Sequence, residues 1–366
     1  MKALIAAMMI MLMASPQAAA EQAIPGEKLG FEMLKASYSD EENALLSPYS
    51  LYTALSMASD GAMGDTRSQL LAALEIVSPG NVDANGVYTA NAAFIDDQAE
   101  VSDEYLKALE KYQARIFDLD TSRTDEINQW ASETTDGLIS PLLTEPLDEN
   151  TRLLLLNAIS MDAGWHEPFK AIDTREAEFH LADAVATVPF INSTRFMDYA
   201  VNGDLRLARL PYAGEGLNAY MVLPDEGGMD EALDRLISEG YAIFDGLEYV
   251  NVRLSMPKLD LSGDVKLSQH LVEAGITEAF SLGADFSGIN GKDDLMLSEV
   301  AQKVVLKLDE DGTRAAAVTQ AVIANKSLIL EEDFVRLTLD RPFILLIRDE
   351  ISSQTLFAAC VVNPEN

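Results

Sequence analysis

The sequence contains a single cysteine, Cys360, so no disulfide bond can form within one chain. Exported proteins often rely on disulfides, and this chain must be held together by its apolar core instead. Hydrophobic residues make up 48% of the sequence, a fraction that suits a globular core. Cys360 lies within the apolar run 356–362, which predicts a buried residue with a packing role.

Basic residues are also scarce. The sequence has 26 Lys and Arg against 60 Asp and Glu, which gives a formal net charge of −34. Nucleic acids, heparin-like polyanions and anionic membranes would be repelled by such a chain, so we exclude these three classes of partner. A net charge far from zero also favours a soluble monomer, which is the expected state.

Histidines are few, and the three present, His166, His180 and His270, show no spacing typical of metal ligands. The sequence lacks the Gly-x-Ser-x-Gly nucleophile motif, the Walker phosphate loop and the glycine motif of dinucleotide-binding proteins. We therefore expect no metal site, no cofactor and no enzymatic activity.

Residues 1–20 have the pattern of a signal peptide. Lys2 supplies the positive start, residues 3–14 form an unbroken apolar run, and three alanines at 18–20 suit a cleavage site. The run is too short to span a bilayer, so we expect secretion, to the periplasm or the extracellular space. Residues 21–366 show no repeat or Pro/Ser-rich linker, which predicts a single domain.

Helical patterns dominate the first part of the chain and strand-like runs the later part. Apolar residues recur at three-to-four spacing in 48–59 and 102–112, and 125–130 begins another helix that ends near Gly137. Strand-like runs are predicted at 205–210, 219–223, 250–256, 304–308, 335–339, 343–347 and 355–362. Because the two types do not alternate regularly, the fold class is predicted to be α+β.

The segment after the strand 304–308 has an unusual composition. Residues 313–322 are small, mostly uncharged and free of Gly and Pro, so composition alone allows an Ala-rich surface helix or a strand. In a strand, alternate residues share a face, and Arg314 would lie on the face where water can solvate it. The opposite face would carry only small residues, namely Thr313, Ala315, Ala317, Thr319 and Ala321.

An eight-residue stretch leads into this segment: Glu310-Asp311-Gly312-Thr313-Arg314-Ala315-Ala316-Ala317. It resembles the hinge of the serpins, where the residue after Gly-Thr is usually acidic. The stretch 337–347, centred on Asp340-Arg341-Pro342-Phe343, resembles the C-terminal pattern of that family. Further matches follow in family order: Ser47-Pro48-Tyr49-Ser50, Asn157-Ala158-Ile159, Gly164-Trp165, Met256-Pro257-Lys258-Leu259 and Ala284-Asp285-Phe286-Ser287-Gly288-Ile289.

The resemblance implies a serpin-like α+β fold with three β-sheets, about eight or nine helices and an exposed reactive-centre loop near 310–335. It also implies a metastable, irreversible inhibitor of serine or cysteine proteases. In such an inhibitor the protease forms an acyl-enzyme on the loop, which then inserts into the main sheet as a strand.

In inhibitory serpins the residue that the protease attacks is usually the seventeenth, counted from the first acidic residue of the hinge. Counting from Glu310, that residue is Lys326, followed by Ser327. A basic residue suits an acidic specificity pocket and so predicts a trypsin-like target. Because 327–342 is longer than in many serpins, cleavage after Leu328 or Leu330 is the alternative, with a chymotrypsin-like, elastase-like or cysteine protease as target.

Residues that control insertion are implied by position. Ser47, Ser50 and Asn157 match a polar cluster under the sheet centre, where Gln302 replaces the family's histidine. Trp165 matches the aromatic residue where insertion begins, and Lys258 with Glu310 matches an ion pair at the base of the loop. Ser160 and Asp162 depart from the Tyr and Lys common at their positions.

A non-inhibitory serpin, acting as a carrier or chaperone-like protein, is the alternative function. Such members often carry bulky or charged hinge residues that prevent insertion. Thr313, Ala315 and Ala317 are small and permissive, which favours inhibition.

Overall fold

The computed structural model describes residues 27–74, 86–95, 100–118, 124–135, 137, 139, 141, 152–313 and 334–365. These residues form eight α-helices and three short 3₁₀ turns. The helices are α1 Glu27–Ser37, α2 Pro48–Gly61, α3 Gly64–Ala73, α4 Asp103–Glu110, α5 Thr124–Thr134, α6 Met229–Glu239, α7 Ser268–Glu273 and α8 Ser287–Asn290. The 3₁₀ turns are η2 Ala171–Asp173, η3 Gly240–Phe244 and η4 Glu278–Phe280.

The described strands belong to two hydrogen-bonded networks. The seven-stranded network holds β2 Val87–Ile95, β3 Arg115–Asp118, β4 Leu153–Met161, β5 Ala163–Gly164, β11 Leu259–Lys266, β12 Leu297–Leu308 and β13 Gly312–Thr313. The nine-stranded network holds β1 Ala44–Leu46, β6 Arg175–His180, β7 Val185–Asn202, β8 Leu205–Pro211, β9 Leu217–Pro224, β10 Glu248–Pro257, β14 Val335–Thr338, β15 Phe343–Asp349 and β16 Gln354–Val361.

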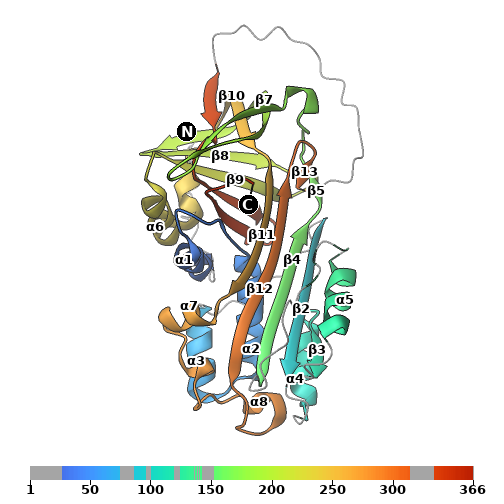
Figure 1. The fold of residues 1–366 in the computed structure, drawn as a ribbon. Coiled ribbons are helices and arrows are strands. Elements are labelled where there is room, and N and C mark those ends of the chain that lie inside the picture. The colour runs from blue at the N-terminus through green and yellow to red at the C-terminus, as the bar shows by residue number, and fades with distance from the viewer. Residues whose placement is uncertain are drawn as a thin grey trace, which may run out of the picture.

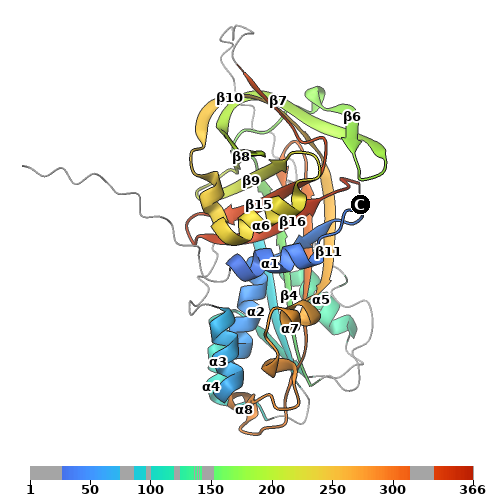
Figure 2. The same ribbon diagram turned by 90° about the vertical axis from the view of Figure 1, so that its left-hand side faces the viewer.

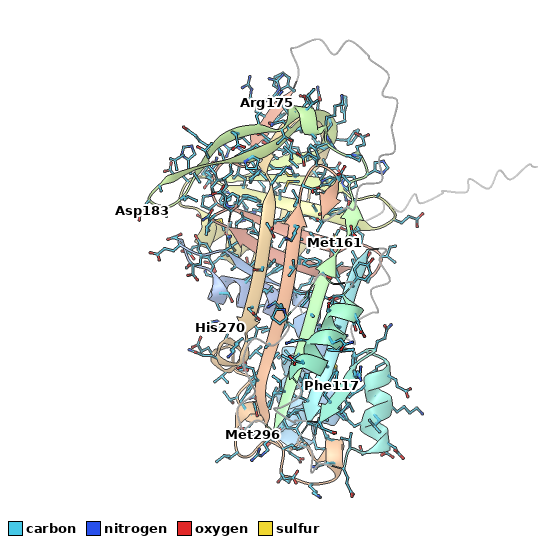
Figure 3. The ribbon with its side chains drawn as sticks, turned by 45° about the vertical axis from the view of Figure 1, so that its right-hand side comes forward. Phe117, Met161, Arg175, Asp183, His270 and Met296 are labelled. Carbon is cyan, nitrogen blue, oxygen red and sulfur yellow. The ribbon has the colours of Figure 1, made fainter. Side chains whose placement is uncertain are left out.

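The seven-stranded sheet runs along the length of the molecule (Figure 1). Its order is β3-β2-β4-β12-β13-β5, and β11 pairs with the free side of β12. The two central strands β4 and β12 are parallel and pair directly, with Asn157 opposite Gln302. In Figure 3, Met161 marks the upper end of β4, and Met296 lies next to the lower end of β12.

The nine-stranded network consists of two sheets that share the 18-residue strand β7. The main part of β7 pairs with β6 and β10, and β10 also pairs with β14. Only the last five residues of β7, 198–202, pair with β8, which continues through β9, β15, β16 and β1. With the seven-stranded sheet this makes three sheets, so the expected α+β architecture is confirmed.

The core fills the spaces between these layers. One apolar cluster joins β4, β11 and β12 to β8, β9, β15 and β16. A second surrounds α2, which is buried along nearly its whole length, and includes α1 and α6 where they cover β16 and β9 (Figure 2). A third lies on the opposite face of β2 and β4, under α5. Cys360 is fully buried within β16, as predicted, and burial raises the pKa of its thiol.

The structure confirms the predicted helices at 48–59 and 102–112, the helix beginning at 125–130, and all seven predicted strands. Most ends are shifted by one to three residues, but the strand predicted at 304–308 begins seven residues earlier, at Leu297. Strands β2, β4, β6, β7 and β11 were not predicted by pattern. All nine residues of β4 are buried, so the alternation that marks a half-exposed strand is absent there.

Candidate functional site: a strand-insertion point at the top of the sheet

Two residues of the hinge, Gly312 and Thr313, form strand β13, which lies between β12 and β5 (Figure 1). Thr313 lies opposite Leu308 on one side and Ala163 on the other, antiparallel to both. Asp309 makes the reversal from β12, because its carboxylate accepts from the amide of Asp311 at 2.9 Å. The hinge therefore already occupies the first rung of an additional strand, with Thr313 fully buried.

Gly312 is required by the close approach of its neighbours. A Cβ atom at this position would lie 2.2 Å from the carbonyl oxygen of Ala163 and 2.6 Å from the Cα of Gly164. Its φ of 154° is also a value that residues with a side chain rarely adopt. The Asp-Gly sequence suggests an ordinary turn, but here the glycine allows β13 to lie close beside β5.

Trp165 holds the reversed segment from the side. Its indole nitrogen donates to the carbonyl of Asp309 at 2.9 Å, and its backbone amide donates to that of Asp311 at 2.8 Å. The indole ring stacks on Tyr212 with ring centroids 4.3 Å apart. The hydroxyl groups of Tyr212 and Thr313 are hydrogen-bonded at 2.6 Å, and burial raises the pKa of Tyr212.

Glu310 is fixed on its other side by an ion pair. Its carboxylate lies 2.6 Å from Nζ of Lys258 and accepts from the hydroxyl of Thr174 at 2.6 Å. Its backbone carbonyl accepts from the amide of Phe169 at 2.8 Å. Burial works to raise the pKa of Glu310, but the hydrogen bonds from Lys258 and Thr174 outweigh it and the pKa is lowered.

The residues predicted to form a polar cluster at the sheet centre lie close together. The amide of Gln302 accepts from the backbone N–H of Ser47 at 3.0 Å and donates to its carbonyl at 3.0 Å. Ser47 caps α2 by accepting from the amide of Ser50 at 3.1 Å. Gln302 therefore ties β12 to the start of the buried helix through a side chain that does not titrate.

Asn157 lies next to Gln302 and completes this cluster. Its amide nitrogen donates to Asn91 of the neighbouring strand β2. The Oδ1 of Asn157 and the hydroxyls of Ser50 and Ser160 are buried without a hydrogen-bond partner among the described residues. A buried polar group that truly lacks a partner costs about 1–3 kcal/mol of folding free energy.

The structure therefore brings together two of the predicted groups. Trp165, Lys258 and Glu310 surround the hinge, and Ser47, Ser50, Asn157 and Gln302 lie deeper between β4, β12 and α2. Sequence reasoning missed Thr174 and Asn91 and gave no contact role to Tyr212, since their partners are distant in the chain. The other predicted residues, Arg314, Ala315, Ala316, Ala317, Lys326 and Ser327, lie outside the described residues.

Within the part of the chain that the structure describes, no group of three or more His, Cys, Asp or Glu residues could hold a metal ion. No helix of the described residues is long and apolar enough to cross a membrane.

Comparison with known proteins decides the family. The model of the family described as serpin (serine protease inhibitor) matches residues 26–364. The chain belongs to the serpin family. The bovine leukocyte elastase inhibitor is 33% identical to this serpin over 354 residues, which cover 88% of this chain and 93% of the relative.

Solved serpin structures share the fold of this serpin over nearly its whole length. Human thyroxine-binding globulin complexed with thyroxine has a TM-score of 0.83 at 26% identity, covering 93% of this chain and 97% of the other. The thermophilic serpin tengpin in its native state has a TM-score of 0.83 at 28% identity, covering 92% and 93%. Both inhibitory and ligand-binding names therefore occur among its relatives.

We predict that removing the partner of Glu310 loosens the hinge in a pH-dependent way. Because the pKa of Glu310 is lowered in the fold, the stability it contributes is present above its usual pKa near 4.5 and is lost as the pH falls through the lowered value. Lys258→Met should destabilise the serpin by about 1 kcal/mol at pH 7.5, and the deficit should shrink on acidification to pH 3.5.

Thermal melting at a fixed scan rate measures this difference. Lys35→Met is the matched control, because Lys35 of α1 forms a partly exposed ion pair with Asp234 of α6, in another part of the fold. Equal effects of the two substitutions at both pH values would contradict the role assigned to the Glu310 ion pair.

Proposed function

We propose that this serpin is a secreted, irreversible inhibitor of a trypsin-like serine protease that acts by acyl-enzyme trapping and loop insertion. The proposal rests above all on β13, the buried pair of hinge residues that already lies between β12 and β5. An ordinary loop would leave these residues at the surface. A strand that has entered the sheet by one rung can lengthen along the same track.

The register of the sheet favours such lengthening. Thr313 lies between Leu308 of β12 and Ala163 of β5, whose residue numbers differ by 308 − 163. The directly paired residues Gln302 and Asn157 differ by the same amount, 302 − 157. A strand continuing from Thr313 would therefore meet matching positions on both sides. The two central strands need to separate by one strand spacing, about 4.8 Å, but need not slide along each other.

Counting along this register assigns a place to each inserted residue. Ala315 would lie between Leu306 and Met161, and Ala317 between Val304 and Ile159. The four neighbours are buried apolar residues facing the core, so only small side chains fit between them. The period-two face of small residues would therefore meet the size requirement of these positions.

Thr319 would lie between Gln302 and Asn157, at the centre of the polar cluster. A hydroxyl placed there can donate to the Oδ1 of Asn157, which has no partner among the described residues in the closed sheet. Insertion would also exchange one parallel ladder for two antiparallel ladders, which adds backbone hydrogen bonds. These gains supply a driving force for a metastable native state.

The chemistry begins at the reactive bond. The hydroxyl oxygen of the protease serine attacks the carbonyl carbon of Lys326, and the bond to Ser327 breaks as the Ser327 nitrogen leaves with a proton. Lys326 is then held as an ester on the protease. Lys326 lies thirteen residues beyond Thr313, so full extension carries the protease by about 43 Å at about 3.3 Å per residue.

Incubation with a protease tests both the cleavage site and the insertion of the loop. Incubation with trypsin should give a covalent complex stable to denaturing gel electrophoresis, and mass spectrometry should find a released peptide that begins at Ser327. Thr313→Arg should abolish the complex and turn the serpin into a substrate, because a charge would enter the buried first rung.

Thr313→Val, which keeps the size of the side chain, is the control and should still form the complex. Rapid cleavage without any complex would instead favour a ligand-binding serpin. Cleavage after Leu328 or Leu330 would leave the mechanism intact and reassign the target to a protease with an apolar specificity pocket.

The register also pairs two departures from the family pattern. Arg314 stands where the family usually has an acidic residue, and Asp162 stands where a lysine is common. Continuing from Thr313, Arg314 would lie between Asp162 and Lys307, on the face away from the core. Lys307 is paired with Asp260 at 2.8 Å, and Asp162 is the neighbour whose charge is opposite to that of Arg314. The two exchanges of sign would then compensate each other.

A charge-exchange cycle tests this pairing. Arg314→Glu and Asp162→Lys should each raise the number of inhibitor molecules consumed per protease, since each puts like charges side by side in the inserted strand. The double variant should recover, with a coupling of about 0.5–1 kcal/mol typical of a partly exposed pair. Strictly additive effects would contradict the proposed register.

A further inference from the structure

Two arginines lie side by side on the outer face of the small sheet formed by β7, β10 and β14. Arg253 of β10 and Arg336 of β14 are directly opposite each other in the parallel ladder, and both are exposed. Neither forms an ion pair with any described residue. Like charges directly opposite on neighbouring strands are destabilising, so this arrangement has a cost in the isolated protein.

The arginines are also held in place. The guanidinium carbon of Arg253 lies 3.8 Å from the ring centroid of Phe334, and that of Arg336 lies 5.6 Å from the same ring. Contact with one aromatic ring restricts both guanidinium groups, while both arginines remain exposed to solvent. A preorganised pair of this kind suits a carboxylate, which accepts from planar guanidinium groups.

Apolar surface and an unused polar atom adjoin the pair. Phe196 and Tyr249 stack at 5.6 Å and are 54% and 70% exposed. Asn251 lies opposite Phe196 and is only 9% exposed. It precedes Arg253 by two residues on β10, so both side chains are on the same face of the strand. Its Oδ1 is buried just below this surface and has no hydrogen-bond partner among the described residues.

We propose that this face, the arginine face of Phe196, Tyr249, Asn251, Arg253, Phe334 and Arg336, binds an acidic loop of the protease that attacks the reactive-centre loop. The proposal rests on the proposed function, from which it takes its partner. It adds a contact outside the specificity pocket, in which a carboxylate of the protease meets the two arginines and apolar atoms cover the aromatic pair.

Geometry and charge favour the protease as the occupant. Phe334 follows Lys326 by only eight residues, which span at most about 29 Å when extended. A protease of about 220 residues is about 40 Å across, so a protease bound at Lys326 comes within reach of this face. In a chain of net charge −34, paired arginines mark a place where an acidic surface is accepted rather than repelled.

Binding to an inactive protease tests the face without requiring inhibition. The probe is anionic trypsin with its catalytic serine replaced by alanine, and the variant is Arg253→Gln with Arg336→Gln. We expect the Kd of the double variant to be about tenfold weaker at low salt, with the difference reduced at high salt. Arg67→Gln with Arg115→Gln, two exposed arginines elsewhere, is the control of equal net charge and should leave Kd unchanged.

Equal Kd values for the Arg253/Arg336 variant and wild type would overturn the proposal, as would an equal loss in the control variant. Circular dichroism and melting temperature verify that all variants are folded. Active trypsin then separates the two proposals. Absence of a covalent complex in every variant refutes the inhibitory function, whereas the arginine face is judged only from binding of the inactive protease.

Discussion

The direct pairing of the two parallel strands β4 and β12 is the constraint on which the rest of this structure depends. Below the hinge these strands form a continuous ladder, yet at its upper end β13 already lies between β12 and β5 in matching register. The sheet is therefore closed over most of its length and opened by one rung at the top. The contacts of Trp165, Tyr212 and Glu310 hold the hinge at that point.

This arrangement gives a physical meaning to the polar cluster at the sheet centre. Gln302 ties β12 to the backbone of Ser47, while Asn157 and Ser50 retain buried polar atoms without partners among the described residues. In the proposed insertion, the bond between Gln302 and Ser47 would resist opening of the sheet, and opening would relieve the polar atoms that lack partners. A glutamine in place of the family's histidine adds no titrating group to this cluster, whereas Glu310 at the top of the sheet has a lowered pKa.

Much of this site follows from the sequence because its motifs are local. The Asp-Gly-Thr hinge, the small alternating face and Trp165 lie in short segments that match the family in order. The partners could not be predicted, because Thr174, Asn91 and Tyr212 reach the site only through pairing between distant strands. Strand β4 was missed because burial on both faces removes its alternation. The arginine face was missed because Arg253 and Arg336 become neighbours only in the sheet.

We propose that the native sheet is a trapped state that would gain stability by accepting the loop as a strand. The most direct measurement compares the melting temperature of the intact serpin with that of the serpin cleaved within its reactive-centre loop. We predict a rise of more than about 10 °C, because a completed strand adds several kcal/mol of hydrogen bonds and packing. An unchanged or lower melting temperature after cleavage would contradict it.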